Sequence, residues 1–361
     1  MNRVILIGNG FDLAHGLNTK YNDFIDDYWE RKSELFLKLY REGNLKFRTQ
    51  GTDPLFDYAE IDIIITNLRY NPNLQIIDEP ERKGYERFHY LTMGIPATQK
   101  RTFTFKNKFL EQIIDKKNIN YWIDIEEEYY LALNECLNDS SDNNIRQLNN
   151  EFLLIKKSLE EYLKTQSAIK VKKNEEIAKK IYWYSSKDNT VSVLGQDNLD
   201  NFLYLNFNYT SIEKIYTYPA NKIIHIHGEL DNPKNPIIFG YGDEIGEKYK
   251  LIEEKNNNDY LDNMKTIKYS ETRNYREMLN FINSDVFQVF IMGHSCGISD
   301  RTLLNTIFEH DNCHSIKIFY HKRNDGTDNF SDIIKNISRN FTKKSLLRER
   351  LIHKEDSEPL L

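Results

Sequence analysis

The chain carries several short, mostly apolar runs, each ended by a glycine or a polar residue. They occupy residues 4–7, 202–205, 223–226, 237–239, 286–292 and 316–320. Runs in which neighbouring positions are apolar are typical of strands buried on both faces of a parallel sheet. Several runs are followed by a turn and then by a helical pattern. The sequence therefore predicts β-α units and an α/β fold with a mostly parallel sheet.

The middle of the chain has a different pattern, with apolar residues at steps of three or four. This spacing is that of amphipathic helices, and it appears in three segments: residues 105–113, 125–136 and 152–162. We interpret residues 31–194 as a large, mostly helical insertion. The predicted α/β core is then discontinuous and consists of residues 1–30 and 195–325.

The last part of the chain, residues 326–361, is predicted to hold a basic amphipathic helix and a tail. Ile333, Ile337 and Phe341 fall on one face of residues 331–351, and lysines and arginines fall on the others. Such a helix could contact a membrane or an anionic partner. We favour a helix that packs on the sheet with its charged face in solvent.

Composition excludes some classes of function. Lys and Arg number 49 against 55 Asp and Glu, a formal charge of −6, so nucleic acid is not an expected partner. No apolar run approaches the ~20 residues that a membrane-spanning helix needs. The three cysteines form no CxxC pair, which suits a reducing compartment. We expect a cytoplasmic protein.

The first strand leads into a glycine turn formed by Gly8, Asn9, Gly10, Phe11 and Asp12. Glycine lets the backbone approach a phosphate, and the next helix would present free N–H groups to it. Leu13 stands where the dinucleotide fingerprint has a third glycine, and residues 21–40 are helical where a second strand is needed. An ordinary dehydrogenase is therefore disfavoured. The alternative is a structural turn without a ligand.

A second polar turn follows the predicted strand at residues 202–205. Thr210 and Glu213 have the spacing of a capping box, so we expect a helix to begin at Thr210. Asn208 then lies at the carboxyl end of the strand, where open α/β sheets bind ligands. Its alternative role is that of an ordinary turn residue.

His225 and His227 close the next predicted strand, before Gly228. Alternation along a strand predicts that the two histidines share one face. No acidic or cysteine partner has metal-ligand spacing, so we expect no metal. Gly228 permits close approach to a ligand, and His227 suits a general base. A structural histidine is the alternative.

A late turn, GHSCGISD at residues 293–300, follows the run at 286–292. Ser299 is the expected N-cap of the next helix. A turn rich in glycine and serine between a strand and a helix is a candidate anion site. Gly293, Ser295 and Asp300 are its candidate binding residues.

Several motifs together resemble those of a known family. They are ILIGNGFDLAHGLNTKYNDF, NYWIDIEEEYYLAL, LNFNYT, IHIHGEL and GHSCGISDRTLL. In this order, from residue 4 to about residue 304, they resemble the landmarks of the bacterial abortive-infection AbiH family. Residues 40–100 and those after 325 carry no motif of the resemblance.

AbiH-like proteins are in turn distantly similar to sirtuin-like NAD-binding domains, which implies a Rossmann-like sheet and NAD as ligand or substrate. Under this resemblance Asn208 and His227 match catalytic residues. Gly8 and Gly10 match the turn at the NAD phosphates, and Gly293 and Ser295 match the turn near adenosine. The remaining expected contacts to the cofactor are Asn9, Phe11, Asp12, Thr210, Gly228 and Asp300.

Two departures from the relatives matter. Thr210 stands where they usually have aspartate, and Asp12 stands where many have serine. The first exchange argues against a ribose-binding role at Thr210. The chain also lacks the cysteine zinc module that sirtuin deacylases carry.

The resemblance implies an NAD hydrolase of phage defence that cleaves the nicotinamide–ribose bond. Asn208 would position ribose hydroxyls or the water, and His227 would act as general base. Two alternatives stay open: a nucleotide-binding sensor or scaffold without catalysis, and a hydrolase of another nucleotide. We also expect that a phage component triggers the protein and that identical chains can assemble. The sequence identifies neither the trigger nor the number of chains. We expect the strand-end residues to converge on one pocket, covered on one side by the helices of residues 105–165.

Overall fold

The computed structural model describes residues 1–42, 55, 78–79, 81–93, 105–116, 122–138, 143–182, 201–219 and 221–361. Internal packing divides the chain into two compact units. The first consists of Met1–Thr19, Tyr129–Ser141 and Leu163–Leu361, and the second of Lys20–Glu128 and Asp142–Tyr162. The domain boundaries expected from the sequence remain a prediction.

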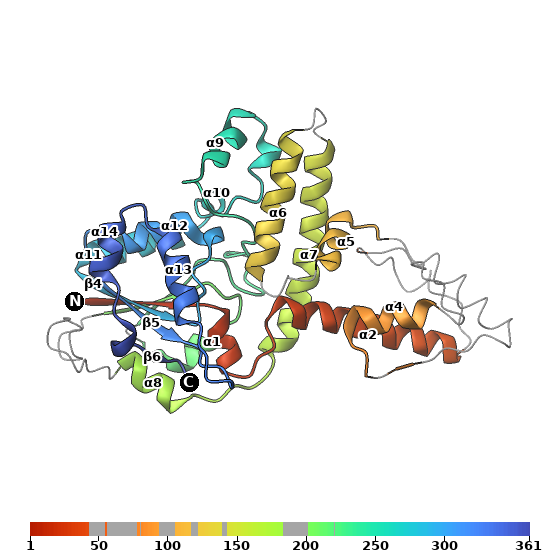
Figure 1. The fold of residues 1–361 in the computed structure, drawn as a ribbon, viewed down its shortest axis with the longest axis horizontal. Helices are drawn as coiled ribbons and strands as arrows, with labels where there is room; N and C mark the ends of the chain where they lie inside the picture. The colour runs from red at the N-terminus through yellow and green to blue at the C-terminus, as the bar shows by residue number, and fades with distance from the viewer. Residues whose placement is uncertain are drawn as a thin grey trace. The chain divides into compact units, whose positions relative to one another are not determined.

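The first unit is built on a six-stranded sheet with the strand order β3-β2-β1-β4-β5-β6, and every pair of neighbours is parallel (Figure 1). The predicted α/β fold with a parallel sheet is confirmed, and its strand order is that of the doubly wound, Rossmann-like architecture. The strands are β1 (Asn2–Ile7), β2 (Phe202–Asn206), β3 (Lys222–His225), β4 (Phe287–Met292), β5 (Cys313–Tyr320) and β6 (Glu358–Pro359).

The register places the switch point of this sheet at the carboxyl ends of β1 and β4. Ile7 of β1 pairs with Asn206 of β2 on one side and with Met292 of β4 on the other. From β1 the chain order runs outward in both directions. Ligands of such sheets bind outside the strand ends at this crevice. The two turns that begin at Gly8 and Gly293 follow these strands directly.

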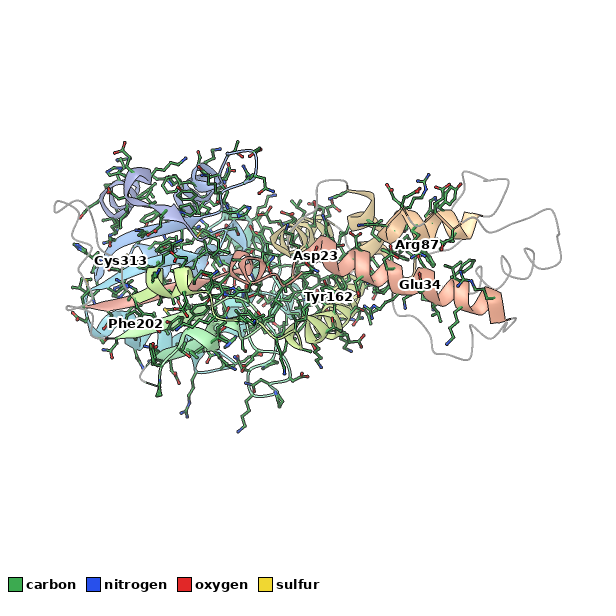
Figure 2. All side chains as sticks on the ribbon, turned by 90° about the horizontal axis from the view of Figure 1, so that it is seen from below. Asp23, Glu34, Arg87, Tyr162, Phe202 and Cys313 are labelled. Atoms are coloured by element: carbon green, nitrogen blue, oxygen red, sulfur yellow. The ribbon has the colours of Figure 1, made fainter. Side chains whose placement is uncertain are left out.

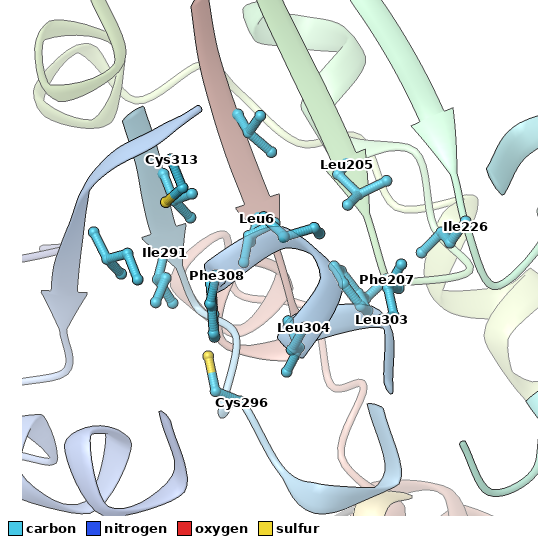
Figure 3. Packing of buried hydrophobic residues seen from close by; sticks show 14 of the residues in the cluster. Leu6, Leu205, Phe207, Ile226, Ile291, Cys296, Leu303, Leu304, Phe308 and Cys313 are labelled. Carbon is cyan, nitrogen blue, oxygen red and sulfur yellow. The ribbon is translucent and has the colours of Figure 1, made fainter. Parts of the chain in front are cut away.

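Both faces of the sheet are covered, which explains why the strands are apolar at successive positions. Val4 and Leu6 face one apolar cluster, and Ile5 and Ile7 face the other. Figure 3 shows the first cluster, in which Leu303, Leu304 and Phe308 pack against the strands. Helices contributing to the two clusters are α1 (Asn9–Ala14), α8 (Glu175–Tyr182), α11 (Asn274–Ser284), α12 (Arg301–Phe308) and α13 (Phe330–Asn340).

The predicted basic segment near the C-terminus packs on the sheet as we favoured, but it forms two helices instead of one, because the backbone is extended at Phe341. Ile333 and Ile337 of α13 and the following Phe341 belong to the apolar cluster, whereas Lys335 and Arg339 are exposed. A second helix, α14 (Lys344–Arg350), follows, and the chain ends in the edge strand β6. The sequence pattern did not predict that strand.

The second unit is helical in its described parts. Trp29 on α2 (Tyr21–Glu42) packs against the rings of Tyr85 and Phe88 on α4 (Gly84–Met93). Arg87 on α4 forms an ion pair of 2.9 Å with Glu34 on α2 (Figure 2). The predicted helices of the middle segment are confirmed. The described helices of this unit are α2 (Tyr21–Glu42), α4 (Gly84–Met93), α5 (Lys108–Asp115), α6 (Trp122–Leu137) and α7 (Asn143–Ser167). The last parts of α6 and α7 belong to the first unit.

The apolar run at residues 237–239 is not a strand, contrary to expectation. Ile238 makes individual hydrogen bonds instead of a strand ladder. Its N donates to His227 O at 2.7 Å, and Tyr209 Oη donates to Ile238 O at 3.1 Å. The first unit also contains several short helical elements. These are η3 (Ile212–Tyr216), α9 (Glu247–Glu254), η4 (Asn258–Tyr260), α10 (Lys265–Lys268), η5 (Ile298–Asp300) and η6 (Lys354–Asp356).

Candidate functional site

Three glycines interlock where β1 and β4 end. A Cβ added at Gly10 would lie 2.9 Å from Gly293 Cα, and one added at Gly8 would lie 2.4 Å from His294 Cα. Gly293 has a φ of +77°, and its own Cβ would lie 2.1 Å from Phe11 N. Glycine is therefore required here because two backbone turns pack directly against each other.

The same contact uses amide hydrogens that were expected to face a phosphate. Gly8 N donates to Met292 O at 3.2 Å, and Gly10 N donates to Gly293 O at 2.8 Å. Phe11 N donates back to Gly8 O at 2.8 Å. A phosphate at this turn would have to rely on other donors.

A buried polar group, which we call the Asp12 cluster, joins the first turn to the turn after β2. It consists of Asp12, Asn208 and Thr210. Asn208 Nδ2 donates to Asp12 Oδ1 at 2.8 Å and to Gly8 O at 3.0 Å. Thr210 Oγ1 donates to Asp12 Oδ2 at 2.5 Å. Burial raises the pKa of Asp12 to about 7, although the Thr210 and Asn208 hydrogen bonds act in the opposite direction.

A second buried carboxylate lies beside the Asp12 cluster. Glu213 receives a hydrogen bond of 2.6 Å from Asn206 Nδ2 and lies 3.0 Å from His225 Nε2. The predicted capping box is wrong, because Thr210 and Glu213 bond to other elements and the short helix η3 begins only at Ile212.

Three side chains lie against Asp300 and a fourth bonds to one of them, and we call these five residues the Asp300 cluster. Lys265 Nζ lies 2.8 Å from Asp300 Oδ1, and its side chain is only 1% exposed. His227 Nε2 lies 3.2 Å from the same oxygen, and His294 Nε2 lies 3.5 Å from Oδ2. Tyr269 completes the cluster with a hydrogen bond of 3.2 Å between its hydroxyl and His227 Nε2.

Burial and the neighbouring Lys265 determine the charges of Asp300 and His227. Burial favours a raised pKa for Asp300, but Lys265 and then His227 hold that pKa well below its ordinary value, so Asp300 is ionised. Burial lowers the pKa of His227 to about 4, with a further lowering from Lys265 and an opposing effect of Asp300. His227 is therefore a neutral imidazole at neutral pH.

His294 is fixed as one tautomer by the backbone. Its Nδ1 accepts a hydrogen bond of 2.9 Å from Cys296 N, so its proton resides on Nε2, the nitrogen that faces Asp300. The Phe207 ring lies 5.1 Å from the His227 ring and 4.1 Å from the His294 ring. Phe207 therefore contacts both histidine rings.

Comparison with protein families identifies the family of this chain. The family model described as bacteriophage abortive infection AbiH matches residues 4–322. The chain belongs to the AbiH family. No similar protein was found among curated proteins or solved structures. Membership gives this AbiH protein a role in abortive infection; the distant similarity to sirtuin-like NAD-binding domains remains a prediction.

The AbiH fold brings together most of the residues that the sequence singled out. Gly8, Gly10 and Gly293 touch one another, Asn208 bonds to Gly8, and His227 lies against Asp300. Their expected contacts to NAD remain predictions.

Other candidates have roles within the chain. Ser295 is exposed, and its carbonyl accepts from Asn336. Phe11 is a core residue beside Tyr216. Asn9 accepts a hydrogen bond of 2.5 Å from Thr19.

Three further expectations are corrected or explained. Ser299 is not the N-cap of α12, because that position is Asp300. His225 and His227 do not share partners: β3 ends at His225, so the alternation stops there, and each histidine faces a different carboxylate. Gly228, at φ +87°, is required because its Cβ would lie 2.2 Å from Pro236 O.

The sequence did not single out Lys265, Tyr269 or His294. His294 lies inside the late motif and could have been included on that ground. Lys265 begins a four-residue helix and Tyr269 follows it, and so short an element leaves no periodic signal. Among the described residues, none of the helices is long and apolar enough to cross a membrane, and no group of three or more His, Cys, Asp or Glu could hold a metal ion.

Proposed function

We propose that this abortive-infection protein cleaves the nicotinamide–ribose bond of NAD at the carboxyl ends of β1 to β4. The observation that carries the proposal is the concentration of buried, mutually bonded polar side chains beyond these strands, in the Asp12 and Asp300 clusters. Burying polar and charged groups costs free energy, and groups with strongly shifted pKa values gather at functional sites. The switch point of a doubly wound sheet is where a nucleotide binds.

The reaction needs one base and one group that orients the ribose. A water oxygen adds to C1′ of the ribose while the C1′–N bond breaks, and the bonding electron pair leaves with nicotinamide. The proton of the water passes to the neutral imidazole of His227. Both amide hydrogens of Asn208 are engaged with Gly8 and Asp12. Its Oδ1 is then the atom that accepts a hydrogen bond from a ribose hydroxyl or from the water.

A second candidate function is a nucleotide sensor without catalysis. It is favoured by the backbone bonds of Gly8, Gly10 and Phe11, which use amides that a catalytic phosphate turn would offer to its ligand. The interlocked glycines also have a packing reason for being glycine. A hydrolase of another nucleotide would use the same edge of the sheet.

The deciding experiment measures free nicotinamide. Purified protein is incubated with NAD, and the total NAD of phage-exposed cells that express the protein is followed in parallel. We expect wild-type protein to release nicotinamide and His227→Ala to release at least ~100-fold less. His353→Ala, at an exposed histidine, is the matched control and should behave as wild type.

Two outcomes would redirect the proposal. NAD that binds without release of nicotinamide, in vitro and in infected cells, would favour the sensor. Hydrolysis of a different nucleotide would favour the third alternative.

A further inference from the structure

The ring of His227 is bordered by two aromatic rings and bonded at one nitrogen. It stacks parallel to the Tyr269 ring, with centroids 6.2 Å apart and planes at 3°, and meets the Phe207 ring at 87°. Nε2 bonds to the Tyr269 hydroxyl and lies 3.2 Å from Asp300 Oδ1. These contacts leave the ring one orientation. Its side chain keeps 5% of its surface exposed.

The charge on Asp300 decides which nitrogen of His227 carries the proton. Lys265 Nζ lies 2.8 Å from Oδ1, the same oxygen that faces His227 Nε2. Beside an ionised carboxylate, a lone pair on Nε2 would be repelled, whereas an N–H is attracted. The proton therefore belongs on Nε2, where it faces Asp300 Oδ1, and the Tyr269 oxygen accepts in the hydrogen bond to this nitrogen. Nδ1, which bonds to no described residue, keeps its lone pair.

We infer that Asp300, supported by Lys265, is a positioning residue that fixes the tautomer of His227 and leaves Nδ1 to accept the proton of the reacting water. The inference rests on the proposed function and changes the role of Asp300, which the sequence had suggested as a direct contact to the cofactor. A carboxylate that orients a histidine base in this way affects turnover strongly, because the wrong tautomer offers a proton where a lone pair is needed.

A merely structural role is the competing explanation, and it is weak on physical grounds. A buried ion pair costs desolvation of both partners, so two apolar residues in its place often stabilise a fold equally well. Removing one partner alone leaves a buried charge without its counterpart, which is strongly destabilising. A test must therefore remove both charges together.

The test compares two double variants. Asp300→Asn/Lys265→Met removes the pair beside His227 and keeps side-chain size. Lys317→Met/Glu358→Gln removes an ion pair between β5 and β6, in which Lys317 Nζ lies 3.4 Å from Glu358 Oε1; Lys317 is buried like Lys265, whereas Glu358 is half-buried. Both are examined for folding by circular dichroism and for kcat and KM with NAD. Nitrogen NMR of ¹⁵N-histidine-labelled protein reports the tautomer of His227, whose signals are assigned by their loss in His227→Gln.

We expect wild-type His227 to be protonated on Nε2 and unprotonated on Nδ1. In Asp300→Asn/Lys265→Met we expect mixed tautomers and a kcat about 100-fold lower, with KM within about threefold. The Lys317/Glu358 variant should keep both the tautomer and kcat. A wild-type His227 protonated on Nδ1, or full kcat in the folded Asp300/Lys265 variant, would overturn the inference. If the wild type cleaves no NAD, the proposed function fails. The NMR measurement of the His227 tautomer then still decides whether Asp300 positions His227.

Discussion

Asn208 and Asp12 are 196 residues apart in the sequence and are joined by a hydrogen bond of 2.8 Å from Asn208 Nδ2 to Asp12 Oδ1. The second amide hydrogen of Asn208 goes to Gly8 O. Asn208 therefore fastens the turn after β2 to the turn after β1, besides any contact it makes with a nucleotide. Substitutions at this position will change stability as well as activity, and the two effects must be separated.

Asn208→Ala should lose activity and stability together. The change leaves the Gly8 carbonyl and a buried carboxylate each with one donor fewer, at a cost of about 1–3 kcal/mol. Asn107→Ala in the second unit is the matched control. Asn107 is a buried asparagine that donates to Glu151 O and accepts from Leu110 N. Urea unfolding should show a loss in both variants.

In Asn208→Ala, the loss of nicotinamide release should be larger than the fraction of unfolded protein explains. In Asn107→Ala, the unfolded fraction should account for the whole loss. Full activity per folded molecule in Asn208→Ala would remove Asn208 from the mechanism and leave it as a structural link between two turns.

Gly293→Ala should prevent folding, whereas Gly16→Ala should not. Both glycines have a φ near +78°, so the backbone strain of alanine is the same, about 1 kcal/mol. A Cβ at Gly16 meets nothing within 4 Å, but a Cβ at Gly293 meets Phe11 N at 2.1 Å. Soluble yield and thermal unfolding measure the difference. Equal behaviour of the two variants would show that the turns after β1 and β4 are not packed as described.

Asp12 should make the protein more stable in mild acid than at neutral pH. Its pKa is about 7 when folded, raised from 3.8 mainly by burial, so the folded state binds a proton more tightly than the unfolded state. The free energy of unfolding then falls as pH rises from about 4 to 7, by a contribution on the order of 4 kcal/mol over the window.

Asp12→Asn should remove this slope, because its amide still accepts from Asn208 and faces the Thr210 hydroxyl without a charge. Urea unfolding between pH 4.5 and 8 compares it with wild type and with Asp332→Asn, an exposed aspartate on α13. A slope unchanged in Asp12→Asn would assign the pH dependence to other groups.

The sequence predicted five of the six strands because uninterrupted apolar positions identify buried parallel strands. It also predicted that residues beyond those strands converge, because parallel strand ends share one edge. The sequence-based prediction was wrong where the same residue types occur both in a local motif and in tertiary contacts. Thr210 and Glu213 have the spacing of a helix cap, but tertiary partners use both side chains. Residues 237–239 are as apolar as a strand, yet their burial comes from packing beside His227.

The Asp300 cluster could be predicted only in part. His227 and Asp300 lie in recognisable motifs, whereas Lys265 is contributed by a four-residue helix whose sequence has no periodicity. The pairing of Lys265 with Asp300 depends on how residues 247–273 fold over the sheet, and short irregular elements give no pattern from which that could be derived. The position of the proton on His227 could not be predicted from the sequence either, because it depends on the distances from Nε2 to Asp300 and Tyr269.

The pH dependence of nicotinamide release should identify the base. A base must be unprotonated, so the rate falls as pH drops through its pKa. Burial places the pKa of His227 at about 4, with Lys265 lowering and Asp300 raising it, and the pKa of Asp12 at about 7. With His227 as base, kcat should stay constant from pH 8 to about pH 5 and fall below that, in Asp12→Asn as in wild type. Circular dichroism at each pH corrects for unfolding. A fall in wild-type kcat near pH 7, together with loss of turnover at every pH in folded Asp12→Asn, would transfer the role of base to Asp12.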